Sequence, residues 1–118
     1  MSRKDYTLYL YDILEEIEKI NKFLENIKGL DELNENDLVL YAVLKSLENI
    51  GEAVKGLPED IKQKYPYQWK SIAGLRDILI HHYWGIDVDI IISILNENLP
   101  ELHHIIKRMI IGIENHKK

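Results

Sequence analysis

The chain has 118 residues, a mass of 13.9 kDa and no cysteine, so residues 1–118 have room for one domain, without disulfides, thiolate metal sites or a cysteine nucleophile. No segment approaches the roughly 18 uninterrupted apolar residues of a membrane span, which favours a cytoplasmic protein without membrane contact. The formal net charge of −5 argues against a protein that coats nucleic acid non-specifically.

Two amphipathic helices are predicted in the first half of the chain. Apolar residues recur every three or four positions over Leu10–Ile27, the spacing of a helix with one buried face, and Gly29 is a suitable C-terminal cap. The same spacing continues over Leu40–Val54 and stops at Gly56. The polar connector between them offers three candidate N-caps for the second helix: Asn34, Asn36 and Asp37.

The second half predicts a short helical turn and two longer helices. The turn lies within "LPEDIKQKYP", between Pro58 and Pro66. A third helix is expected from Tyr67 to Trp84, ending at Gly85. Asp87 then caps an apolar series over Val88–Ile113, and the series keeps its phase through Pro100. This pattern predicts one kinked helix, or two nearly collinear helices that share a face.

These elements predict an all-α protein, an antiparallel bundle of four to five helices. Ile78–Ile80 and Ile90–Ile92 are consecutive, so the helices that carry them are apolar on most sides. A helix that is apolar all round is buried all round. In a domain of this size the extra surface is best covered by a second copy, and we expect a homodimer.

The stretch "LRDILIHHYWG", Leu75 to Gly85, carries polar groups that packing does not require. Any anionic ligand should meet this half of the chain, because residues 61–118 have a net charge of +2 and residues 1–60 a net charge of −7. Arg76 offers a planar fork matched to a phosphate, and His81 and His82 can exchange protons near neutral pH. These two residue types can cleave RNA without a metal: a base activates the ribose 2′-hydroxyl, an acid protonates the 5′-oxygen, and a cation stabilises the phosphorane.

Helical geometry restricts how these groups can act together. At about 100° per residue, Arg76 and Tyr83 lie within roughly 20° of each other, whereas His81 points roughly 140° away from Arg76. A straight helix would therefore not bring Arg76 and His81 to one phosphate. Either the helix loosens before Gly85, or a symmetric dimer places two copies of the motif across a shared groove.

The spacing of Arg76, His81 and Tyr83 matches the R-x4-H-x-Y motif of HEPN-domain proteins, and the surrounding sequence resembles their HepT group (DUF86). Supporting stretches cover nearly the whole chain: "YLYDILEEIEKI", "LENIGEAVKGLPEDI", "WKSIAGLRDILIHHYWGID" and "NLPEL". The resemblance implies a dimeric, metal-independent ribonuclease toxin that needs no cofactor. It also implies a partner, a minimal nucleotidyltransferase antitoxin of the MntA type, with which the dimer could form a larger hetero-oligomer.

Carried over to this chain, the resemblance assigns roles to individual residues. Arg76 and His81 become the catalytic pair, and Tyr83 the hydroxyl to which the antitoxin attaches AMP. An AMP group on the face that carries Arg76 would add negative charge and bulk where the RNA phosphate binds. Asp77 and His82 are supporting residues, and Asp77 stands where many relatives have asparagine. Its charge could pair with Arg76 or hold His81 protonated.

Each of these residues also has a purely structural interpretation. Arg76 could form an ion pair with Asp77 or with a carboxylate of the first helix, and His81 and His82 could stabilise a helix C-terminus. On the last helix, His103, His104, Lys107 and Arg108 are expected to form a basic strip that contacts RNA. Adjacent histidines point about 100° apart, so we predict no metal site.

Two functions are consistent with the sequence. The first is an endoribonuclease toxin that leaves 2′,3′-cyclic phosphate and 5′-hydroxyl ends and is neutralised by AMPylation of Tyr83. The alternative is a catalytically silent helical subunit that presents substrate or nucleotide to a partner nucleotidyltransferase. A purely structural bundle would respond to substitution of Arg76 or His81 only by changes in stability.

Overall fold

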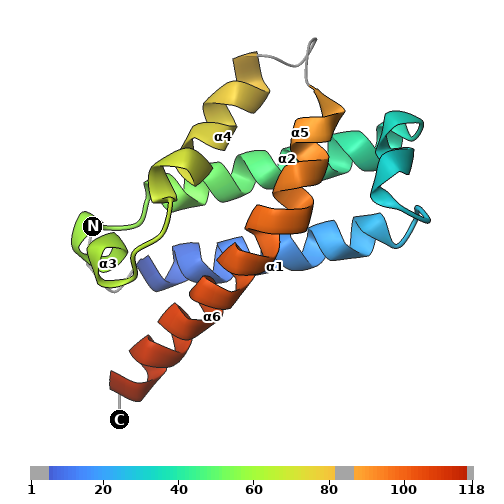
Figure 1. Cartoon of the computed structure of the whole chain (residues 1–118). Helices are drawn as coiled ribbons and strands as arrows, with labels where there is room; N and C mark the ends of the chain where they lie inside the picture. Colours follow the sequence, from blue (N-terminus) through green and yellow to red (C-terminus); the bar gives the residue numbers. More distant parts are fainter. Residues whose placement is uncertain (1–5, 82–86, 117–118) are drawn as a thin grey trace.

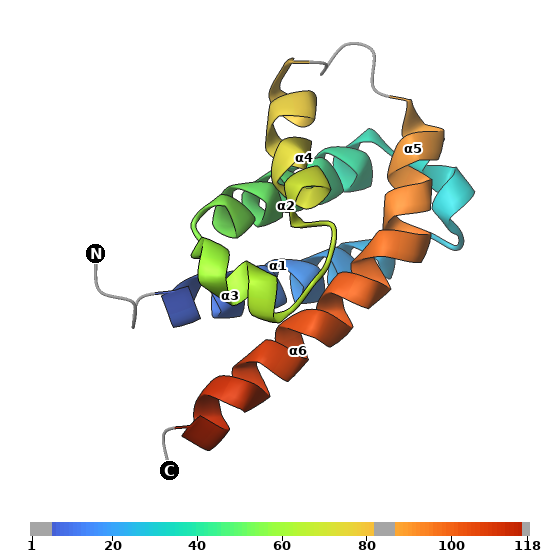
Figure 2. The ribbon, with the colours of Figure 1, turned by 60° about the vertical axis from the view of Figure 1, so that its left-hand side comes forward.

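The computed structural model describes residues 6–81 and 87–116, with the backbone alone for residues 78–81 and 116, and its described elements are all helical. Helices α1 (Tyr6–Leu24) and α2 (Asp37–Lys55) run antiparallel, and α4 (Trp69–His81) packs on α2 (Figure 1). Helix α6 (Leu99–His116) crosses α1 and runs away from α4 in both ribbon views (Figure 2). The predicted all-α class is confirmed over the described residues.

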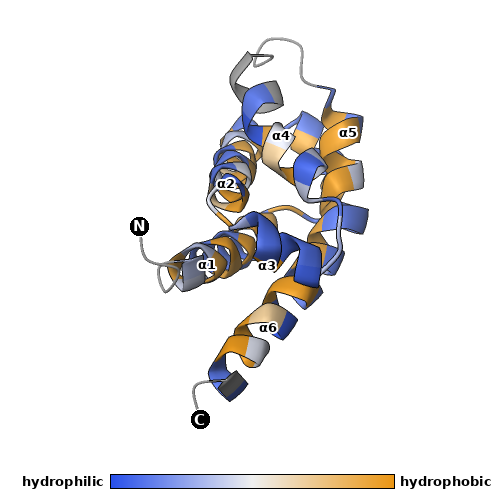
Figure 3. Cartoon of the chain, turned by 90° about the vertical axis from the view of Figure 1, so that its left-hand side faces the viewer, coloured by the Kyte–Doolittle hydropathy of each residue, from blue (hydrophilic) through white to orange (hydrophobic). Residues whose placement is uncertain are grey.

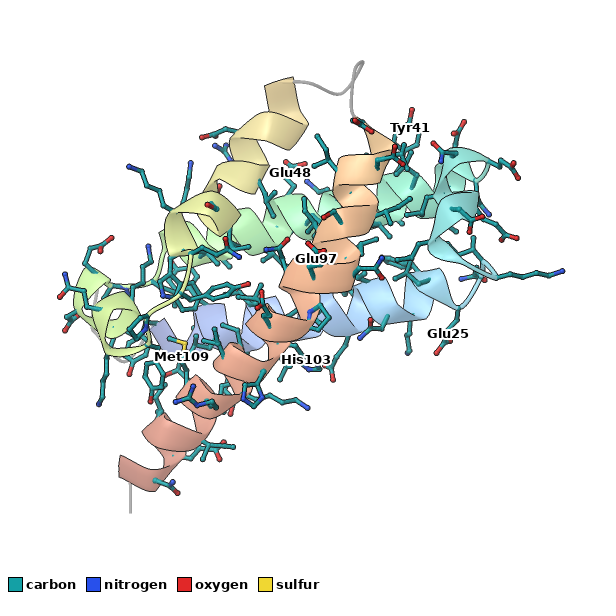
Figure 4. All side chains as sticks on the ribbon, in the orientation of Figure 1. Glu25, Tyr41, Glu48, Glu97, His103 and Met109 are labelled. Carbon is teal, nitrogen blue, oxygen red and sulfur yellow. The ribbon has the colours of Figure 1, made fainter. Side chains whose placement is uncertain are left out.

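The predicted hydrophobic faces form one core. Every helix of eight or more residues contributes to it, and α6 crosses α1 with residues such as Met109 buried (Figure 4). The most completely buried side chains include Leu10, Ile13, Ile17, Ile20, Leu33, Val43, Leu47, Ile50, Leu102, Ile106 and Met109. Apolar side chains that remain exposed include Leu38, Tyr41 and Ile90, at the starts of α2 and α5. No helix among the described residues is long and apolar enough to cross a membrane.

The end of α1 differs from the prediction. The helix ends at Leu24, and turn hydrogen bonds such as Ile27 N to Leu24 O follow it, so Gly29 does not cap α1. Gly29 instead precedes a 3₁₀ turn, η2 (Leu30–Asn34), with an extended backbone at φ −156°. The connector forms this turn because it buries Leu33 completely in the core.

Two side-chain caps agree with the sequence. Of the three candidates for α2, Asn36 is the N-cap, and its side chain accepts a hydrogen bond from Val39 N at 3.0 Å. Asp87 caps α5 (Val88–Ser93) by accepting from Asp89 N at 2.9 Å. The short helix between Pro58 and Pro66 is α3 (Glu59–Lys64); it buries none of its residues and is hydrophilic in Figure 3.

Pro100 is accommodated by a local widening of the last helix. Helix α5 continues through a π-helical turn, η3 (Ile94–Asn98), directly into α6, and Leu99 N donates to Ile94 O five residues earlier. Proline lacks the N–H of a regular helical bond and its ring collides with the preceding turn, so the wider turn relieves both problems. Of the two predicted arrangements, one kinked helix or two nearly collinear helices, the structure has a single helical run from α5 to α6, and its irregular turn lies just before Pro100.

Candidate active site

Arg76 is positioned by the packing of α4 against α2. Ile72 and Leu75 are buried on the core side of α4. On the α2 side, Gly51 approaches the α4 backbone so closely that a Cβ atom there would lie 2.9 Å from Arg76 N and 3.1 Å from Ile72 O. Only glycine permits this approach, because a real Cβ would overlap backbone atoms that cannot rotate away. The Gly51 contact therefore sets the position of Arg76 relative to α2.

The Arg76 guanidinium is held by two carboxylates at the surface. Its Nε atom lies 2.6 Å from Glu52 Oε2, and its Nη1 atom lies 3.4 Å from Asp77 Oδ1. The arginine side chain is 39% exposed, and the two carboxylates are more exposed than the arginine. The ion pair with Asp77 was one of the structural possibilities from sequence. The second carboxylate comes from α2 rather than from the first helix, which corrects that part of the expectation.

Lys55 extends this group of charges. Its Nζ atom lies 3.6 Å from Asp77 Oδ1, so Asp77 contacts both the arginine and the lysine. We call Glu52, Lys55, Arg76 and Asp77 the Arg76 cluster. Sequence reasoning missed Glu52 and Lys55. The only signal for Glu52 is its place next to Gly51 in "IGEA", since its link to Arg76 depends on how two helices cross.

Two open grooves border the Arg76 cluster, and Lys55 lines both. The first groove, of about 490 Å³ between α1 and α2, is lined by the carboxylates of Asp12, Glu15, Glu16 and Glu52. The second groove, of about 680 Å³, lies along α3 and the start of α4, and its charged lining residues are Lys55, Lys62, Lys70 and Glu59. The cluster therefore separates an acidic groove from a basic one.

Of the remaining predicted residues of the motif, the structure describes only His81, and that only by its backbone. His81 is the last residue of the helix, and its backbone alone is described. His82 and Tyr83 lie outside the described residues. The structure therefore positions Arg76 and Asp77 in full and places His81 by its backbone, five residues after Arg76 on the same helix.

The predicted basic strip lies on α6, away from α4. His103 is half-buried where α6 crosses α1 (Figure 4). Burial and the positive charge of Lys107 lower the pKa of His103 below 6.5, whereas the negative charge of Glu18 acts to raise it. The Arg108 guanidinium lies over the Tyr65 ring, 5.9 Å from its centre. His104 is exposed beside them. Among the residues that the structure describes, no three histidine or acidic side chains form a group that could hold a metal ion.

Comparison with known proteins gives a consistent assignment. Residues 13–109 match the family described as Ribonuclease HepT-like. Two proteins of Methanocaldococcus jannaschii are each named as a "Putative RNase". One is 40% identical over 97% of this chain and 94% of its own length. The other is 46% identical over 91% of this chain and 92% of its own length. A protein of Thermococcus cleftensis named "Probable ribonuclease HepT" is 41% identical over 86% of this chain and 89% of its own length. No solved structure matches. The resemblance seen in the sequence is thereby confirmed, and the chain belongs to the HepT-like ribonuclease family.

Proposed function

We propose that this protein is a metal-independent endoribonuclease toxin whose chemistry is carried by Arg76 and His81. The observation that carries the proposal is membership of the HepT-like ribonuclease family over residues 13–109. The geometry supports it in one respect: Arg76, the cation that the reaction needs, lies at the surface on the helix that ends at His81. A ribonuclease of this kind needs no more than a cation and groups that transfer protons.

The reaction is a transesterification. The 2′-oxygen of the ribose attacks the adjacent phosphorus while its proton passes to a base. The bond from phosphorus to the 5′-oxygen breaks, and an acid protonates that oxygen, which leaves a 2′,3′-cyclic phosphate and a 5′-hydroxyl. His81 serves as one of the two proton-transfer groups, typically worth about 10²–10⁴-fold in rate.

The two observed ion pairs of Arg76 do not use all of its N–H donors, and the others can bind the phosphate. A guanidinium has five N–H donors. The pairs with Glu52 and Asp77 use Nε–H and one N–H of Nη1, so three N–H groups have no partner among the described residues. Glu52 and Asp77 hold the guanidinium in place, and the remaining donors can bind two oxygens of the scissile phosphate.

A homodimer would complete this site. Positions 76 and 81 point roughly 140° apart on one helix, so two copies of α4 facing each other would place Arg76 of one copy opposite His81 of the other. The exposed apolar residues Leu38, Tyr41 and Ile90 give the monomer additional surface that a second copy could cover.

The partner of the toxin is a minimal nucleotidyltransferase of the MntA type, which attaches AMP to Tyr83. The AMP group adds a negative charge and bulk, and both oppose binding of the RNA phosphate. Toxin and antitoxin then form a larger assembly in the cytoplasm.

The test is cleavage of total RNA by unmodified protein in EDTA, with the mass of the protein checked for AMP. Cyclic-phosphate ends are expected, with loss of about 10²-fold or more in His81→Ala and little loss in the matched His82→Ala variant. Arg76→Lys keeps the charge but not the fork, and should lie between wild type and Arg76→Ala. Loss of cleavage in EDTA, or equal losses in the two histidine variants, would contradict the proposal.

One observation favours the second candidate, the silent binding subunit. Arg76 is already paired with two carboxylates, as a structural arginine would be. If unmodified protein leaves RNA intact while still binding the nucleotidyltransferase and accepting AMP at Tyr83, the binding subunit is the better assignment. A purely structural bundle would do neither.

A further inference from the structure

The outward face of α4 carries an open row of positions that leads to the candidate active site. Positions 70, 74, 77 and 81 fall within about 60° of one another around the helix and span about 16 Å along it. Lys70 and Asp77 are exposed, and a Cβ atom at Gly74 would meet no atom within 4 Å. Among the described residues, no atom therefore blocks the row at Gly74, between Lys70 and Asp77.

The basic groove joins the start of this row. Lys55, Lys62 and Lys70 line it against one carboxylate, Glu59. Lys62 lies 3.8 Å from Glu59 and Lys55 3.6 Å from Asp77, whereas Lys70 has no ionic partner among the described residues. The side chain of Tyr67 and the buried ring of Trp69, 5.4 Å apart between centres, form an apolar part of the lining. Phosphates are attracted to such a groove and displace its weak surface ion pairs.

The other surfaces near α4 are less suited to RNA. The groove between α1 and α2 presents four carboxylates, which repel phosphates. The strip on α6 lies on a helix that runs away from α4, and its His103 favours the neutral form. Charge complementarity therefore selects the basic groove among the surfaces around the Arg76 cluster.

We infer that single-stranded RNA enters through the groove formed by Lys55, Lys62 and Lys70 and runs along the row of positions 70, 74 and 77 toward the end of α4. This inference rests on the proposed ribonuclease function and adds the path of the substrate. It replaces the α6 strip as the principal RNA contact. Lysine ammonium groups contact phosphates, so the groove binds RNA through its backbone and reads no sequence.

The sharpest test places a charge in the row at Gly74, where an added Cβ atom would meet no described atom within 4 Å. Gly74→Glu and Gly74→Gln are matched in size and differ by one negative charge. Binding is measured by fluorescence anisotropy with a labelled 2′-O-methyl oligonucleotide, which lacks the 2′-hydroxyl needed for cleavage. At 0.1 M salt the glutamate variant should bind about twofold more weakly than the glutamine variant, the screened effect of one like charge about 6–7 Å away in water, and the difference should shrink as salt is raised.

A second pair of variants compares the two basic surfaces. Lys70→Gln should weaken binding about fivefold at 0.1 M salt and reduce the slope of log K against log salt by about 0.7, the value for one phosphate contact in a single strand. Lys107→Gln on α6 is the matched control and should bind like wild type. A loss in Lys107→Gln without one in Lys70→Gln would overturn the inference.

Other outcomes are equally decisive. Equal binding by the two Gly74 variants, with cleavage of unmodified RNA intact in wild type, would reject the path and leave the ribonuclease function standing. Failure of wild type both to bind the probe and to cleave RNA would reject the function, and the path with it. If light scattering shows that Gly74→Gln halves the particle mass of a wild-type dimer, the row is covered by a second copy and the inference is wrong.

Discussion

Replacement of Gly51 by alanine tests whether the close contact between α2 and α4 positions the candidate site. The added Cβ would lie 2.9 Å from Arg76 N, 3.1 Å from Ile72 O and 3.3 Å from Ala73 O. All three neighbours are backbone atoms of α4, so no side-chain rotation can make room. The helix must move by roughly half an ångström to reach ordinary van der Waals separation.

The magnitude follows from two opposing effects. Alanine is better than glycine in a helix interior by about 1 kcal/mol. Inserting a methyl group into a packed contact costs about 1–3 kcal/mol. Gly74→Ala isolates the first effect, because Gly74 is also helical and a Cβ there meets nothing within 4 Å. We expect Gly74→Ala to stabilise the fold by up to about 1 kcal/mol and Gly51→Ala to be about 1–3 kcal/mol less stable than Gly74→Ala.

Equilibrium urea unfolding, at one protein concentration for all variants, measures this difference. The same variants are then assayed for RNA cleavage, and Gly51→Ala should lose more activity than its stability explains, since the shift changes the position of Arg76 relative to Glu52. If Gly51→Ala and Gly74→Ala stabilise the fold equally, the close approach of α4 to α2 does not exist as described.

Four further predictions concern single contacts. Asn36→Ala should cost about 1 kcal/mol in urea unfolding, through loss of the cap on Val39 N, whereas Asn34→Ala should cost less. Glu52→Gln should lower the cleavage rate while changing stability by less than about 1 kcal/mol, because the pair is exposed; a stability loss without a rate loss would contradict this. Asp77→Asn frees Arg76 and Lys55 from one carboxylate and should tighten RNA binding in the anisotropy assay. Burial and Lys107 lower the pKa of His103 below 6.5, so stability should fall as pH drops from 6.5 through that lower value; by NMR titration, Lys107→Gln should raise the pKa and Glu18→Gln should lower it.

Helical periodicity was sufficient for the elements with one buried face. The spacing of Leu10, Ile13, Ile17 and Ile20 identifies α1, and all four residues are buried. Local rules also placed Asp87 as a cap and detected the disturbance at Pro100. They failed at the end of α1, where Gly29 satisfied the rule for a C-cap but the chain turned earlier in order to bury Leu33. Burial of Leu33 depends on how the helices pack in three dimensions, so it cannot be predicted from the spacing of residues along the chain.

The candidate site shows the same division. Arg76 and Asp77 are neighbours in sequence, and their ion pair was among the predicted possibilities. The contact of Arg76 with Glu52 joins positions on two helices, and it depends on the crossing of α2 and α4 at Gly51. Periodicity describes one helix at a time, so the sequence predicted which helix carries the arginine but not which helix supplies its second partner.

The faces of α4 explain how one helix can serve both the core and a surface site. Ile72 and Leu75 face the core, Arg76 lies on the side of α2, and Lys70, Gly74 and Asp77 face outward. If Arg76 were buried, its charge would need full compensation, and its donors would be lost to the substrate. The small size of Gly51 removes that conflict, since α2 comes close enough for Glu52 to hold the guanidinium while the side chain stays 39% exposed. A larger residue at position 51 would separate the helices and leave Arg76 without its contact with Glu52.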